Sequence, residues 1–214
     1  MTAPEPASLG EVDLFLPADL FEFTTPEDPA EARREFDAHA AQVFGRMGDE
    51  QRTTLVDGIM AWREKLDEIG VVMHAMAAVP GTAEHAAAHW HFLAGVVDTV
   101  PLAEIDAGEV LVRYLATQPL AENRYTESYA TAMGWGLGII TTDVLRLETL
   151  PPGASHVPPD LPVGIAVGLS GTPDGELALL VVGLCLDTEQ TLDMASIVSV
   201  IAGESVIRPA VVDA

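Results

Sequence analysis

The feature that most constrains the fold is a pair of apolar segments, 163–170 and 176–186, joined by the sequence Gly-Thr-Pro-Asp-Gly at 171–175. Glycine, proline and aspartate in a short connection between apolar runs are a strong hairpin signal. Two further segments, 127–133 and 136–147, also have strand patterns. The last third of the chain is therefore predicted to form antiparallel strands.

The N-terminal part of the chain combines a strand pattern with two helical patterns. A short strand is expected from Val12, and it stops at Pro17. Asp28 is placed to cap a helix that Pro29 begins. The apolar stripe of this helix consists of Ala32, Phe36, Ala40, Val43, Phe44 and Met47. A second helix ends at Gly70. Its predicted stripe consists of Leu55, Ile59, Trp62, Leu66 and Ile69.

Two strands and two helices complete the pattern. A strand over 71–79 and a partner over 87–97 are predicted to form a hairpin, with Pro80-Gly81 as its turn signal. A third helix is expected from Pro101 to the residue before Pro119. Asp187 is placed to cap a final helix. The expected inner side chains of that helix are Leu192, Ala195, Ile197, Val198 and Ile201.

The order of these elements predicts an α+β fold, with a curved antiparallel β-sheet flanked by helices. Residues 1–10 are expected to be a disordered leader, 11–203 a single α+β domain and 204–214 a loose C-terminal tail. The proline-rich stretch 151–162 is interpreted as a loop within that domain, because the strands on either side need each other.

The charge balance restricts the possible partners. Asp and Glu number 33 against 10 Lys and Arg, giving a formal net charge of −23, and the acids are densest from Glu11 to Asp37. Such a field repels phosphate backbones and attracts basic surfaces, so we expect a basic protein partner and no nucleic acid. The sequence has no N-terminal signal and no apolar run long enough for a bilayer, so we expect a cytoplasmic protein without membrane insertion.

A histidine cluster is the most suggestive motif. In a helix, His85 and His89 would share one face, as a metal site requires. In a strand, His89 and His91 would point the same way, with Trp90 and Phe92 buried opposite. The favoured interpretation is the strand, with its two histidines exposed. Small-molecule or metal binding at this cluster is an alternative.

Other motifs resemble functional sites without completing them. The glycine-rich segment 134–138 lacks the spacing and the following helix of a phosphate loop, so a strand with bulges or a close backbone crossing is favoured. Segment 168–172 has Thr172 where a nucleophile elbow needs glycine. The single cysteine, Cys185, lies in an apolar run and is interpreted as a buried small hydrophobe. We therefore expect no catalytic residue, no metal ligand, no cofactor and no enzymatic activity.

The overall pattern resembles a known fold family. A strand closing on a proline (Asp13-Leu14-Phe15-Leu16-Pro17) precedes helices and a curved sheet. Later come Val163-Gly164-Ile165-Ala166-Val167, Leu177-Ala178-Leu179-Leu180-Val181-Val182 and a helix opening Asp187-Thr188-Glu189. This is similar to the Mog/PsbP-type α/β/α sandwich found in small actinobacterial proteins of the LpqN kind. The resemblance implies a non-enzymatic binding module with an adaptor or chaperone-like role. It carries over no functional residue and no surface anchor.

The main functional hypothesis is therefore a protein-interaction module with an adaptor or chaperone-like role. An alternative is an immunity or mimic protein that neutralises a basic toxin or a nucleic-acid-binding protein, and this requires acids concentrated on one face. The second alternative is the small-molecule or metal-binding domain centred on His85, His89 and His91.

Overall fold

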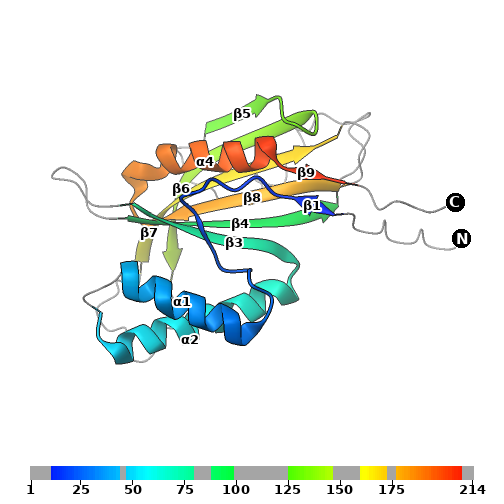
Figure 1. The fold of residues 1–214 in the computed structure, drawn as a ribbon. Coiled ribbons are helices and arrows are strands. Elements are labelled where there is room, and N and C mark those ends of the chain that lie inside the picture. The colour runs from blue at the N-terminus through cyan, green and yellow to red at the C-terminus, as the bar shows by residue number, and fades with distance from the viewer. Residues whose placement is uncertain are drawn as a thin grey trace, which may run out of the picture.

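The computed structural model of the chain describes residues 11–43, 47–79, 88–98, 125–146, 160–172 and 177–208. Its largest element is a sheet of seven strands in the order β2-β3-β4-β8-β7-β6-β5 (Figure 1). All neighbouring strands of this sheet are antiparallel, which confirms the predicted α+β fold. The strands are β2 (Phe21–Glu22), β3 (Val71–Val79), β4 (Ala88–Asp98), β5 (Tyr125–Tyr129), β6 (Trp135–Arg146), β7 (Asp160–Gly171) and β8 (Leu177–Cys185).

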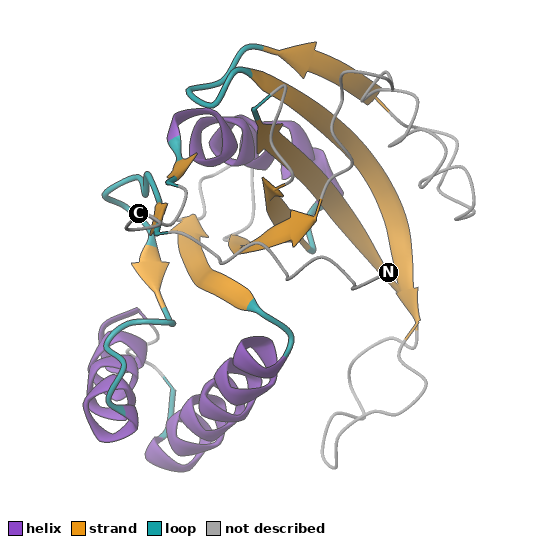
Figure 2. Cartoon of the chain, turned by 90° about the vertical axis from the view of Figure 1, so that its right-hand side faces the viewer, coloured by secondary structure: helices purple, strands orange, loops and turns teal. Residues whose placement is uncertain are grey.

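Helices lie on both faces of the curved sheet (Figures 1 and 2). Helices α1 (Pro29–Val43) and α2 (Asp49–Glu68) form a pair on one side, close to β2 and β3. On the other side, a 3-10 turn, η2 (Thr188–Gln190), leads into helix α4 (Thr191–Glu204). The expected third helix lies outside the described residues.

Helix α1 begins where the sequence predicts. The backbone N–H of Glu31 donates to Asp28 Oδ1 over 2.8 Å, so Asp28 caps the first turn as expected. Three residues of the predicted stripe, Ala32, Phe36 and Ala40, are buried. They pack with Phe23 and Met76 in a cluster that attaches the helical pair to β2 and β3.

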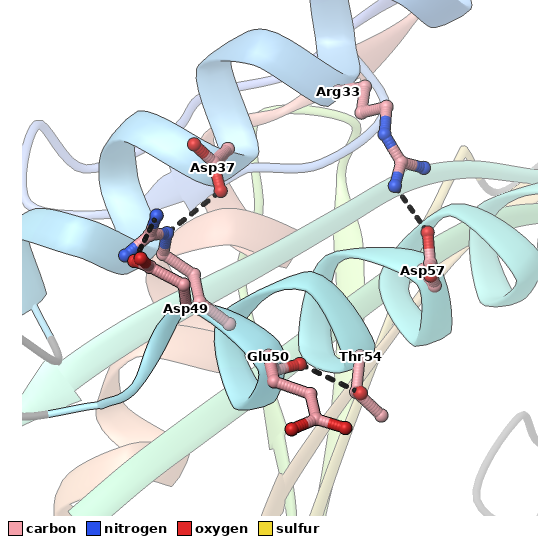
Figure 3. A network of polar contacts seen from close by, with 7 residues as sticks. Arg33, Asp37, Asp49, Glu50, Thr54 and Asp57 are labelled. Carbon is pink, nitrogen blue, oxygen red and sulfur yellow. Dashed lines mark hydrogen bonds and ion pairs between the residues drawn. The ribbon is translucent and has the colours of Figure 1, made fainter.

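Ion pairs link the two helices on their outer side (Figure 3). Arg33 of α1 pairs with Asp57 of α2. Arg52 of α2 forms an ion pair with Asp37 of α1 over 2.9 Å. It forms a second ion pair with Asp49 of its own helix, also over 2.9 Å. The carboxylate partners are at least half exposed, so these pairs orient the helices and contribute only modestly to stability.

Helix α4 packs closely on strands β7 and β8, because glycines in these strands leave room for the side chains of the helix. A Cβ on Gly183 would lie 2.6 Å from a methyl group of Val198, and one on Gly168 would lie 2.9 Å from Ala202. The buried face of α4 fills this space with Met194, Ala195, Val198, Ile201 and Ala202. Leu192 is 70% exposed, so its predicted inner position is wrong.

The glycine-rich segment of β6 serves packing. A Cβ on Gly136 would lie 2.5 Å from Thr131 and 2.9 Å from the ring of Tyr129, and one on Gly138 would also contact that ring. Residues 135–138 belong to the strand β6, as expected, and Gly134 forms the bend before it. The ring of Tyr129 packs across the glycines of β6, whereas the sequence suggested a bulge or a close crossing by another backbone segment.

The two ends of the described chain meet in a small second sheet. Strand β1 (Val12–Asp13) pairs with β9 (Val206–Ile207), and Asp13 forms an ion pair with Arg208 over 2.6 Å. Ser205 is fully buried, and its Oγ accepts the backbone N–H of Phe15 over 2.9 Å. Residues 205–208 therefore belong to the fold, although the sequence assigned them to the 204–214 tail. Residues 1–10 and 209–214 lie outside the described part.

Several boundaries differ from the prediction. Strand β5 ends at Tyr129, so the predicted strand 127–133 is wrong beyond that residue, and β1 ends at Asp13 instead of reaching Pro17. Strand β7 begins at Asp160, so 160–162 pair with β6 instead of continuing the predicted loop 151–162. Asp187 caps η2 first, since its Oδ1 accepts the backbone N–H of Glu189 over 3.1 Å, and α4 follows. The rest of the predicted loop lies outside the described residues.

The close packing of α4 gives a first prediction. Gly183→Ala forces a methyl group into Val198 and Met194, and we expect it to lower the free energy of unfolding by about 1–3 kcal/mol. Gly58→Ala is the matched control, because nothing lies within 4 Å of a Cβ at that site in α2. We expect the control to gain about 0.5–1 kcal/mol. Urea unfolding measures both, and equal effects would contradict the packing argument.

Candidate binding groove

The buried face of α2 is rotated from the predicted stripe. Val56 and Leu66 are buried, but Trp62 is 62% exposed and Ile69 is 74% exposed. The helix packs on α1 and the start of β3 with a face that includes the half-buried Arg63, a position that hydropathy does not mark as inner. The expectation that Trp62 and Ile69 are core residues is therefore wrong.

An open groove of about 1050 Å³ lies where α2 ends and β3 begins. Its walls come from α2, from the first residues of β3 and from the connection between β2 and α1. Its lining consists of Thr24, Glu27, Pro29, Met60, Ala61, Arg63, Glu64, Asp67, Ile69, Gly70, Val71, Val72 and Val96.

Arg63 holds one wall of the groove in place. Its Nη2 donates to the carbonyl oxygens of Pro26 over 2.6 Å and Glu27 over 3.2 Å. Its Nη1 is buried and has no hydrogen-bond partner in the described part of the chain. The guanidinium is thus used inside the protein, where it connects α2 to the segment before α1.

The groove combines apolar walls with unpaired carboxylates. Met60, Ile69 and Val72 contribute apolar surface, and Ile69 is among the most exposed large apolar side chains in the described residues. Glu27, Glu64 and Asp67 also line the groove, and none of them forms an ion pair with another described residue. The neighbouring cation Lys65 pairs with Glu68 over 2.8 Å. With three carboxylates and the single guanidinium of Arg63 in its lining, the groove carries a net negative charge beside an apolar surface.

The histidine cluster adopts the extended geometry. His89 and His91 lie on β4, while Trp90 and Phe92 on the opposite face are 8% and 0% exposed, as expected for a strand. His89 and His91 are both half-buried, which corrects the expectation of two exposed histidines. His85 lies outside the described residues.

The structure brings His91 against a histidine that the sequence did not indicate. His74 Nε2 lies 3.4 Å from His91 Nδ1, and the ring of Phe23 lies tilted against that of His74 with 4.8 Å between the ring centroids. Burial, with a smaller contribution from His91, lowers the pKa of His74 to about 4. Burial also lowers the pKa of His91. Only the strand register, which pairs Met76 with His91, places the two rings together.

Other reactive side chains lie in the protein interior. Within the described ranges, no three His, Cys, Asp or Glu side chains lie close enough to hold a metal ion. Ser170 is buried and its Oγ donates to Thr131 Oγ1 over 2.8 Å. Cys185 is buried, as expected, and burial raises the pKa of its thiol.

Comparison with known proteins yields no relative: no family model, no curated protein and no solved structure matches the chain. The similarity to the Mog/PsbP-type sandwich therefore stays a prediction. None of the described helices is both long and apolar enough to cross a membrane.

The role of Arg63 can be tested by substitution. Arg63→Met keeps the apolar stem but removes two hydrogen bonds to backbone carbonyls. We expect the free energy of unfolding to fall by about 1–3 kcal/mol, because the donor is charged and partly buried. Lys65→Met is the matched control, whose exposed ion pair should contribute at most about 1 kcal/mol. Chemical unfolding of both variants distinguishes a wall-forming Arg63 from a surface charge.

The His74 environment predicts a pH dependence. The folded protein keeps His74 neutral down to about pH 4, whereas the unfolded chain takes up the proton near its ordinary pKa of 6.5. The contribution of His74 is therefore complete above about pH 6.5 and is lost as the pH falls toward 4, by at most about 1.4 kcal/mol per pH unit.

The variant His74→Phe isolates this effect from the titration of the many carboxylates. The difference in unfolding free energy between the natural protein and the variant should decrease from pH 7 to pH 4.5. A difference that stays constant over this interval would contradict a buried, neutral His74.

Proposed function

We propose that this protein is a non-enzymatic, cytoplasmic interaction module, with an adaptor or chaperone-like role, that binds a basic segment of a partner protein in the groove. The observation that supports it best is the combination, in one open concavity, of exposed Ile69 with the carboxylates of Glu27, Glu64 and Asp67, which pair with no other described residue. A segment carrying both apolar and basic side chains matches these two properties.

The carboxylates and the apolar side chains of the groove have different physical roles in binding. Carboxylates at a rim accelerate encounter with a basic partner and contribute little each to final affinity, since solvent and salt screen them. Apolar side chains that become desolvated on binding supply most of the affinity. The net charge of −23 extends the attraction beyond the groove itself.

The distribution of acidic residues bears on the alternative that the protein is an immunity or mimic protein. Exposed acids occur on the α1/α2 pair, at Glu31 and Glu35, and on the opposite side of the sheet, at Asp193 and Glu204 of α4. A phosphate mimic requires its charge on one face, so this arrangement favours the interaction module. Metal binding is not proposed, because the described residues contain no suitable set of ligands.

A fluorescent heptapeptide of alternating lysine and valine tests the proposal by anisotropy at low salt. The triple variant Glu27→Gln, Glu64→Gln, Asp67→Asn should bind it about tenfold more weakly, and the difference should shrink in high salt. The control Glu35→Gln, Glu50→Gln, Glu189→Gln removes as many exposed charges elsewhere. Equal losses in the two triple variants would reduce the effect to overall charge and contradict a groove site.

A second pair of variants tests the apolar contribution. Ile69 and Trp62 are both exposed near the end of α2, but only Ile69 lines the groove. Ile69→Ala should weaken the peptide several-fold, whereas Trp62→Ala should leave its affinity unchanged. A peptide of alternating glutamate and valine should not bind. Failure of the lysine–valine peptide to bind the natural protein would reject the proposed function.

A further inference from the structure

The outer edge of β3 is only partly covered by its neighbour. Strand β2 pairs with Ala75 and Met76, and the backbone N–H of Phe23 donates to the carbonyl of His74 over 2.7 Å. The chain then leaves the sheet toward α1. The stretch Val71–Met73 therefore has no strand beside it on this edge within the described residues.

This uncovered edge coincides with the groove. Gly70, Val71 and Val72 line the groove on the β3 side, and Thr24, which follows the end of β2 by two residues, lines it as well. A segment lying in the groove along the line of β2 would meet the free edge of β3. An exposed sheet edge is a template for strand addition, because it presents backbone groups that lack a partner strand.

We propose that the groove binds the partner's basic segment in an extended conformation, as a short strand added to β3 in line with β2. This inference rests on the proposed function and specifies how the same site recognises its partner. The register of β3 against β4 is irregular between Val71 and Met73, and such a bulge limits the length of regular pairing. The added strand is therefore short, and side chains must supply most of the selectivity.

The side chains of an extended segment suit the mixed apolar and acidic lining of the groove. Successive residues of a strand point to opposite faces, so an alternating sequence presents apolar groups on one side and basic groups on the other. Met60, Ile69 and Val72 can receive the apolar row. The carboxylates of Glu27, Glu64 and Asp67 line the same groove, and the long flexible stems of lysine side chains let the basic groups turn toward them. A helical segment would instead place like side chains three and four residues apart.

Backbone methylation of the peptide provides the test, and it leaves the protein unchanged. Two versions of the lysine–valine heptapeptide carry N-methyl groups either on all valines or on all lysines. In a strand, amides of alternate residues point to the same side, so only one version loses the donors that face β3. We expect one version to bind at least about tenfold more weakly and the other to bind within about threefold of the parent peptide.

Amide hydrogen exchange of the complex locates the contact. The parent peptide should slow exchange at one or more amides of Val71–Met73 and leave the other edge strand, β5 (Tyr125–Tyr129), unaffected. Equal affinity of both methylated peptides, equal loss in both, or protection of β5 instead of β3 would overturn the strand-addition mode while groove binding still stands. Absence of binding by the parent peptide would reject the proposed function and this inference together.

Discussion

The close contact between α4 and the β7–β8 hairpin is the interaction on which the rest of the structure depends. It requires glycine at Gly168 and Gly183, because a side chain there would collide with Val198 or Ala202. Strand β8 is also the link between β7 and β4, so the hairpin joins the two halves of the sheet. The helix covers one face of this junction, and the α1/α2 pair can then occupy the opposite side near the β3 edge (Figure 1). The groove exists because that pair is attached at an edge instead of over the centre of the sheet.

The sequence predicts the elements of this architecture more reliably than the contacts between them. Alternation and turn chemistry identify β3, β4, β7 and β8, because strand period and glycine-containing turns are local properties. The cap at Asp28 is equally local, and its bond to the N–H of Glu31 is present. Short-range patterns are sufficient for such features, since all the participating groups lie within a few residues.

Features that depend on register or on helix rotation could not be predicted in the same way. His74 meets His91 only because β3 and β4 pair in one particular register. Trp90 donates to Gln190 over 3.0 Å although one hundred residues separate them. Trp62 fits the helical spacing of the core but lies outside it, because Arg63 takes an inner position to bond the backbone of Pro26 and Glu27. A polar residue with a specific backbone partner can thus rotate a helix away from the face that hydropathy favours.

The single cysteine has a practical consequence for studying this fold. Cys185 is 2% exposed at the end of β8, close to the beginning of α4, and its Sγ donates to the carbonyl of Asp187 over 3.2 Å. With a buried thiol and a raised pKa, the folded form reacts slowly with alkylating reagents. The rate at which the natural chain is labelled therefore reports how often the α4 side opens. Because the sequence contains no other thiol, this measurement of local opening needs no engineered probe.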